Sequence, residues 1–193
     1  MQFLTWPRFS LLESLDLSDS QAGTAAVSNL LRLVHSLAAL QHISLSELSL
    51  SDVSPALLCC GVAHCVSLSL ARSRLTSPQL EAVLLTSQSG LCPCERPPHR
   101  PASLNLAHNV LSLVPPDRLA GGLTAILRLN IAHTQLGPGQ AQALFSLMAS
   151  SETELRHLIL RDVDISTVNH VVLQQALHRT ISLDVQVRSF SLS

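Results

Sequence analysis

The sequence predicts an α/β solenoid in which a curved parallel β-sheet lines the inside and α-helices cover the outside. Leucine supplies 40 of the 193 residues, and a pattern of three apolar positions, spaced by three residues and then by two, recurs seven times. The third apolar position of each copy follows the previous one by 28, 25, 36, 25, 29 and 25 residues. A strand followed by a helix fills a unit of this length. We therefore expect a single domain over residues 1–193, built from about seven irregular repeats.

A strand is expected at each copy of the pattern, because alternate residues of a strand point to opposite faces. In the fourth copy, Leu104 and Leu106 face one side, whereas Ser103 and Asn105 face the other. The apolar residues of successive copies would stack into one continuous core. The seven copies cover residues 12–17, 40–45, 65–70, 101–106, 126–131, 155–160 and 180–185.

The segments between the strands are expected to be helices, because their apolar residues recur at helical spacing. The clearest example is residues 137–150, where Ala141, Leu144, Phe145 and Met148 share one face. The other predicted helices cover residues 25–37, 53–65, 77–87 and 166–177.

One spacing of 36 residues exceeds the others, and the excess lies in residues 87–102. Four of the ten prolines cluster there, in the run CPCERPPHRP. Proline neither extends a helix nor donates a hydrogen bond to a sheet. We expect a surface loop, inserted between the third predicted helix and the fourth strand.

With these residues the chain resembles a leucine-rich-repeat protein of the ribonuclease-inhibitor-like, intracellular subtype. The best-matching unit is ILRLNIAHTQLGPGQAQALFSLM (126–148), and the resemblance covers about residues 11–188. The resemblance implies the solenoid fold and work as a scaffold or adaptor. Members of this family serve as enzyme inhibitors, as substrate receptors of ubiquitin ligases and as scaffolds in nuclear or innate-immune assemblies, and the sequence does not choose among these roles.

The sequence departs from the family pattern three residues after the last strand position, where the family places Asn or Cys. Only the fourth copy matches, with Asn109. Leu48 and Val163 occupy this position in two other copies, and their side chains form no hydrogen bonds. We therefore expect irregular turns at these two residues and modest stability.

Neither end of the sequence carries a clear polar capping unit, although terminal repeats usually need one. Residues 1–9 and 189–193 are short candidates for this role. A fragment or shorter isoform of a longer protein would account for this feature.

Composition and charge argue against several function classes. The formal net charge is -1, and all 12 basic residues are Arg, so no nucleic-acid partner is expected. There is no run of 18 apolar residues, which argues against a membrane span. The first 17 residues lack the basic and apolar regions of a signal peptide, and the 5 Cys, an odd number, fit a reducing compartment. We expect an intracellular protein, cytoplasmic or nuclear, that is not secreted.

Local sequence shows no catalytic or cofactor-binding motif. The phosphate-binding patterns GxxxxGK[ST] and GxGxxG are absent, as are the nucleophile motif GxSxG and the zinc motif HExxH. We therefore expect a non-enzymatic protein that needs no cofactor.

Three residues of the Pro-rich loop are weak metal candidates: Cys92, Cys94 and His99. Thiolate and imidazole are zinc ligands, but a structural zinc site normally takes four ligands. No second Cys pair lies nearby in the sequence. A metal- or redox-responsive module using this CPC loop is therefore an alternative function. Cys59, Cys60 and Cys65 are interpreted as buried, small apolar residues.

Two pairs of histidines occupy equivalent positions of the repeat. His108 and His133 each follow the last strand position by two residues, in neighbouring copies. Because adjacent strands lie about 4.8 Å apart, we expect these two imidazoles to be neighbours on the rim of the sheet. His42 and His157 share a position within the second and sixth strands. All four are interpreted as solvated residues, with a metal site as the alternative.

The outward strand and turn residues are expected to form the concave face, acidic in the first two repeats and rich in Arg and His in the rest. Charge complementarity would steer a partner and fix its register. Solenoids commonly use such extended concave surfaces for binding. We therefore predict a protein-interaction module, an adaptor or scaffold, with the substrate-recognition part of a ubiquitin ligase or nuclear scaffold assembly as an alternative. The predicted contact residues are Asp16, Asp19, Glu47, Arg72, Asn105, His108, Arg128, Asn130, His133, His157 and Arg161.

Overall fold

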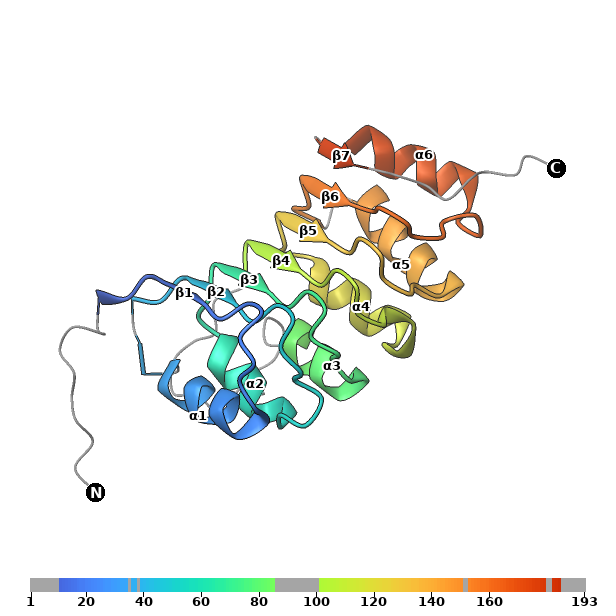
Figure 1. Cartoon of the computed structure of the whole chain (residues 1–193). Helices are drawn as coiled ribbons and strands as arrows, with labels where there is room; N and C mark the ends of the chain where they lie inside the picture. Colours follow the sequence, from blue (N-terminus) through green and yellow to red (C-terminus); the bar gives the residue numbers. More distant parts are fainter. Residues whose placement is uncertain are drawn as a thin grey trace, which may run out of the picture.

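The chain forms an open solenoid of alternating strands and helices in this computed structural model. The structure describes residues 11–34, 36–37, 39–85, 101–150, 153–179 and 182–184. Within these residues, seven strands form one parallel sheet, and six α-helices all lie along one side of it (Figure 1). The predicted α/β solenoid, with its sheet on one side and helices on the other, is confirmed.

Each strand spans three residues and pairs in parallel with the next strand of the chain, so the order in the sheet is β1-β2-β3-β4-β5-β6-β7. The middle residue of each strand is apolar and pairs with the middle residue of the next, as Leu68 does with Leu104. This register agrees with the predicted repeat pattern in all seven copies. The strands are β1 (Ser14–Asp16), β2 (His42–Ser44), β3 (Ser67–Ser69), β4 (Ser103–Asn105), β5 (Arg128–Asn130), β6 (His157–Ile159) and β7 (Ser182–Asp184).

The helices cover one face of the sheet and leave the other face open (Figure 1). Pro55, Pro116 and Pro138 stand in the first turn of their helices, where the fixed backbone angle of proline suits a helix start. The helices are α1 (Thr24–Val34), α2 (Pro55–Val62), α3 (Ser77–Leu85), α4 (Pro116–Leu123), α5 (Pro138–Ala149) and α6 (His170–Arg179), with a short 3-10 helix, η2 (Leu111–Leu113).

The core lies between the sheet and the helices. The middle strand residues Leu104, Leu129 and Leu158 are buried, and Phe145 of α5 is fully buried opposite them. Burying one such side chain contributes about 1.5–3 kcal/mol to the free energy of unfolding. The equivalent residues of the two end strands, including Leu183 in β7, are only partly buried. The middle repeats therefore hold the most tightly packed part of the molecule.

Two elements were not predicted, α4 and η2, and one helix starts later than expected. The glycines of α4 lower its helix propensity, but Gly122 lets α4 approach α3 closely, since a Cβ there would lie 2.5 Å from Leu84 Cβ. Helix α6 begins at His170, although the apolar spacing predicted a start at residue 166. The side chain of Asn169 accepts a hydrogen bond from the Val171 amide at 2.9 Å, and this N-cap sets the start.

The turn after each of the first six strands places a non-glycine residue in the left-handed backbone region. These residues are Asp19, Glu47, Arg72, His108, His133 and Asp162, with φ between 55° and 65°. The conformation costs about 1–2 kcal/mol per residue. In the first five of these turns a backbone hydrogen bond to the next repeat offsets this cost, as between the amide of His108 and the carbonyl of Ala132 at 2.9 Å.

The predicted irregularity at Leu48 and Val163 is wrong. Glu47 and Asp162, the residues just before them, adopt the same left-handed conformation as their equivalents in the other repeats. Leu48 is 2% exposed and Val163 1% exposed. Apolar packing therefore fills this position where no polar side chain bonds the backbone.

Asn109 occupies the position equivalent to Leu48 and Val163 with a polar side chain. Its Nδ2 group donates to the carbonyls of Leu70 at 2.7 Å and Leu106 at 3.0 Å, and its Oδ1 accepts from the amide of Leu75 at 3.3 Å. The hydroxyl of Ser73, at the equivalent position one repeat earlier, donates to the carbonyl of Leu45 at 2.8 Å. Both side chains are buried and tie consecutive repeats together.

A buried glutamine makes a second polar link between repeats. Gln79 of α3 donates through Nε2 to the carbonyls of Leu50 and Val53, both at 2.6 Å. Its Oε1 accepts from the amide of Thr76 at 2.8 Å, the reciprocal half of a capping box. Gln140 of α5 repeats the link, donating to the Val114 carbonyl at 2.8 Å. These glutamines satisfy loop carbonyls that the helices would otherwise cover.

Most of the predicted loop, residues 87–100 of the range 87–102, lies outside the described residues. Among the residues that the structure does describe, no helix has the length and apolar character needed to cross a bilayer.

Replacing Asn109 with Ala should lower the free energy of unfolding by about 2–3 kcal/mol, because a buried polar group that loses its partner costs about 1–3 kcal/mol. Urea denaturation followed by circular dichroism measures this change. Asn29→Ala, on the exposed face of α1, is the control, with an expected change within about 0.5 kcal/mol. Equal stability of the two variants would contradict the role given to Asn109.

Candidate partner-binding surface

The open face of the sheet consists of two rows of side chains, one from the first and one from the third residue of each strand. The strand register places equivalent residues beside each other, about 4.8 Å apart. The first row is Ser14, His42, Ser67, Ser103, Arg128, His157 and Ser182. The second row is Asp16, Ser44, Ser69, Asn105, Asn130, Ile159 and Asp184.

A third row, the turn row, follows the carboxyl ends of the strands and consists of the left-handed residues Asp19, Glu47, Arg72, His108, His133 and Asp162. The predicted contact residues therefore divide into two groups. Asp16, Asn105, Arg128, Asn130 and His157 lie on the sheet itself. Asp19, Glu47, Arg72, His108 and His133 lie in the turn row. Arg161 stands between them, one position before Asp162.

The middle of the turn row is a continuous chain of contacts. Arg72 Nη1 lies 3.2 Å from Glu47 Oε1, and its Nη2 lies 3.5 Å from His108 Nε2. The rings of His108 and His133 stack with centroids 4.5 Å apart and planes inclined by 17°. His133 Nδ1 lies 2.9 Å from Asp162 Oδ2. The predicted neighbourhood of His108 and His133 is confirmed, and the cation of Arg72 is engaged within the chain.

The surroundings of His108 disfavour its protonated form. Desolvation lowers the pKa of His108 below 6.5, and the positive charge of Arg72 lowers it further, while Glu47 acts in the opposite direction. The unfolded chain therefore binds a proton at His108 more readily than the folded chain does. The contribution of His108 to stability is complete above the ordinary histidine pKa and is lost as the pH falls through the lowered pKa.

Small hydroxyl side chains fill the amino-terminal half of the open face and bond to one another. The Oγ atoms of Ser18 and Ser44 lie 2.6 Å apart, and those of Ser46 and Ser69 lie 2.7 Å apart. Asn105 Nδ2 extends this chain by donating to Ser69 Oγ at 3.0 Å. Much of the hydrogen-bonding capacity of this half is therefore used inside the protein.

Three polar residues of the second row also bond their own backbone. Asn105 Oδ1 accepts from the amide of Ala107 at 3.1 Å, and Asn130 Oδ1 accepts from that of Ala132 at 3.0 Å. Asp16 accepts from the amide of Ser18 at 2.8 Å, and hydrogen bonds from Ser18 lower the pKa of Asp16. These bonds turn the side-chain oxygens toward the turns.

A shallow hollow of about 490 Å³ lies on the carboxyl-terminal half of the open face, over β4 to β7. Arg161 donates to Asp184 Oδ2 through Nη2 at 2.5 Å and through Nε at 3.1 Å, across the β6–β7 pair. This contact neutralises the charge of Arg161. The residues around the hollow that matter for its chemistry are Asn105, Arg128, Asn130, His157, Ile159 and Asp184.

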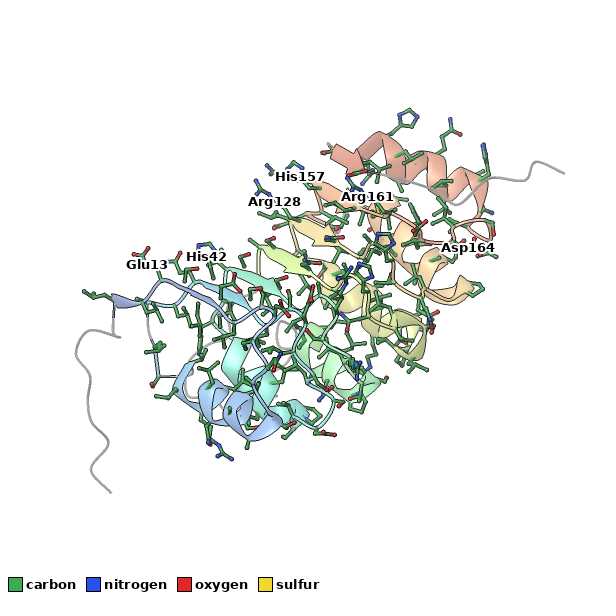
Figure 2. All side chains as sticks on the ribbon, in the orientation of Figure 1. Glu13, His42, Arg128, His157, Arg161 and Asp164 are labelled. Carbon is green, nitrogen blue, oxygen red and sulfur yellow. The ribbon has the colours of Figure 1, made fainter. Side chains whose placement is uncertain are left out.

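Arg128 and His157 are neighbouring side chains in this hollow. They pair in register on β5 and β6 and project from the sheet on the side away from the helices (Figure 2). Arg128 is exposed and His157 is half-buried. Among the described residues, Arg128 has no acidic partner within ion-pair distance, whereas Arg72 and Arg161 each have one. The guanidinium group of Arg128 is therefore available to an external anion.

Two residues of the hollow, Ile159 and Asp184, were not among the predicted contact residues. Ile159 breaks a row of otherwise polar residues, and comparing the third strand position across the seven copies would have identified it. Asp184 belongs to the last and weakest copy of the pattern, and its pairing with Arg161 depends on the register of β6 and β7. The predicted charge gradient is thus weakened, since Arg72 neutralises Glu47 and Asp184 neutralises Arg161.

The weak metal candidates Cys92, Cys94 and His99 lie outside the described residues. Within the described residues, no group of three or more His, Cys, Asp or Glu could hold a metal ion. His42 and His157 stand on β2 and β6, with three strands between them, so they cannot share a ligand.

The buried-cysteine interpretation is confirmed for Cys59, which is 5% exposed, and for Cys65, which is 1% exposed, whereas Cys60 is only half-buried. Burial raises the pKa of the Cys59 thiol to about 11 and that of Cys65 to about 12. At neutral pH both side chains are therefore thiols, and the thiolate is the form that binds metal and reacts.

Replacing Arg72 with Gln should raise the pKa of His108, because the substitution removes a nearby positive charge. An NMR titration of the histidine ring protons measures this pKa directly. Arg74→Gln is the matched control, since it removes the same charge two residues away and should leave the pKa unchanged. The account of the turn row would be wrong if Arg72→Gln had no effect, or if both variants raised the pKa equally.

No protein-family model matches this chain, and a comparison with curated proteins finds no significant relative.

Proposed function

We propose that this protein is a non-enzymatic interaction module, an adaptor or scaffold, that binds a protein partner through the open face of its sheet. The helices cover the other face, so the open face presents side chains from all seven strands to a single partner. Solenoids use such extended surfaces for binding. The proposal needs no bound cofactor or metal ion.

The observation that carries the proposal is the free guanidinium group of Arg128. The two other arginines among the predicted contact residues are engaged, because Arg72 contacts Glu47 and Arg161 contacts Asp184. Arg is among the residues that most often dominate binding energy at protein interfaces. An exposed Arg in a shallow hollow, with no acidic side chain of the described residues within ion-pair distance, favours an external partner.

Aromatic anchors do not provide an alternative site within the described residues. Phe145 is the one Phe or Trp that these residues contain, and it is fully buried in the core. The interface must therefore use Arg, His and aliphatic side chains. The hollow offers all three in Arg128, His157 and Ile159.

Charge reversal tests the proposal. Affinity capture from cell lysate should enrich a protein with the wild type, and the double variant Arg128→Glu, Arg161→Glu should lose it by at least tenfold. The matched control, Arg32→Glu with Arg118→Glu, changes the net charge equally on α1 and α4 and should retain it. The single variant Arg128→Glu breaks no ion pair among the described residues, so its loss of binding would point to the interface and not to a lost internal contact.

Circular dichroism spectra should be the same for all variants. Retention of the partner by the double variant would place the interface elsewhere and contradict the proposal. Loss of the partner by the control variant as well would also contradict it, because the effect would then follow net charge and not the open face.

A further inference from the structure

We infer that the hollow over β4 to β7 binds an extended acidic segment of a partner protein, in which an Asp or Glu stands two residues from an aliphatic residue. The inference rests on the proposed function and adds the chemistry of the partner. Three observations carry it: the unpaired charge of Arg128, the position of Ile159 and the spacing between them.

The unpaired positive charge of Arg128 favours a carboxylate as its ligand. A guanidinium group presents a planar fork of donors that matches the two oxygens of a carboxylate. Arg128 has this fork free, whereas Asp184 already occupies the fork of Arg161. His157, directly across the β5–β6 pair, adds a ring N–H donor beside Arg128. An acidic side chain placed between them would find complementary groups on both strands.

Ile159 supplies an apolar contact next to this charge. The other residues of its row are Asp, Ser or Asn, and Ile159 is half-buried at the floor of the hollow. Covering its exposed part with an aliphatic side chain removes apolar surface from water, which is favourable. The site therefore favours a partner that carries both an acidic and an aliphatic side chain.

The spacing sets the order of these two side chains. Ile159 pairs with Asn130, which follows Arg128 by two residues on β5, so Ile159 is the diagonal neighbour of Arg128. Diagonal neighbours on adjacent strands lie about 7–8 Å apart. In an extended peptide, side chains two residues apart point the same way and lie about 6.7 Å apart. The acidic and aliphatic residues of the partner should therefore be separated by one residue.

The local charge disfavours a nucleic acid in this hollow. Phosphate backbones are bound by clusters of cations that neutralise several charges at once. Here one free guanidinium group stands near the carboxylate of Asp184, and the whole chain has a formal net charge of -1. A single carboxylate next to an apolar side chain matches the hollow better than a row of phosphates does.

A random twelve-residue peptide library displayed on phage tests the inference. Selection uses the full chain, with depletion on the Arg128→Glu variant. Selected peptides should be enriched in Asp or Glu separated by one residue from Ile, Leu or Val. Fluorescence anisotropy with one labelled synthetic peptide then gives the affinities. Changing its acidic residue to the amide should weaken binding at least tenfold, and Arg128→Gln should give the same loss.

Two further variants locate the site. Ile159→Ser should weaken binding at least threefold, and the control Arg118→Gln on α4 should leave it unchanged. Peptides without acidic enrichment, or no selected peptides at all, would overturn the inference. Tighter binding of a single-stranded oligothymidine than of the selected peptide would also overturn it.

The outcomes separate this inference from the proposed function. Peptides that lack acidic residues but depend on Ile159 would overturn the acidic chemistry and leave binding by the open face intact. Peptides that bind equally well to Arg128→Glu and Ile159→Ser would place the site off the open face, which contradicts both proposals.

Discussion

Parallel pairing of three-residue strands, each centred on a buried apolar residue, is the constraint from which the rest of the structure follows. The register holds from Leu15 in β1 to Leu183 in β7. Because every repeat enters the sheet in the same register, residues at equivalent positions become neighbours about 4.8 Å apart. A one-residue slip would turn every buried strand residue toward water. The same constraint that builds the core therefore also builds the rows of the open face and the turn row.

The turn row shows how this arrangement uses surface charge. Contacts run from Glu47 through Arg72 and His108 to His133 and Asp162. Exposed ion pairs contribute about 0–1 kcal/mol each, so these contacts add little to stability. Their effect is to neutralise charges along one rim, while the left-handed backbone that holds them is stabilised by bonds between repeats. Arg128, on the sheet itself, has no ion-pair partner among the described residues, and this contrast is the basis of the proposed binding site.

The sequence was sufficient to predict the strands, because the apolar residues at alternate positions recur in the same pattern in all seven copies. It also predicted that His108 and His133 are neighbours, since equivalent positions meet in a regular array. It did not predict α4, whose glycines suit a close approach to α3 and not helix propensity. Nor could it predict that Asp184 neutralises Arg161 or that Gln79 links two repeats, because such contacts depend on side-chain conformations. The candidate site was thus predicted as a surface, and the structure was needed to separate its two paired arginines, Arg72 and Arg161, from the unpaired Arg128.

We expect the open face, and not the helical layer, to be the part of the molecule that contacts a partner. Methyl NMR of isoleucine-labelled protein tests this most directly, using the partner captured by the wild type. The Ile159 methyl group lies in the hollow, whereas that of Ile165 is buried behind the turn. Adding the partner should shift the Ile159 signal and leave the Ile165 signal in place. An unchanged Ile159 signal in a fully bound sample would contradict the account.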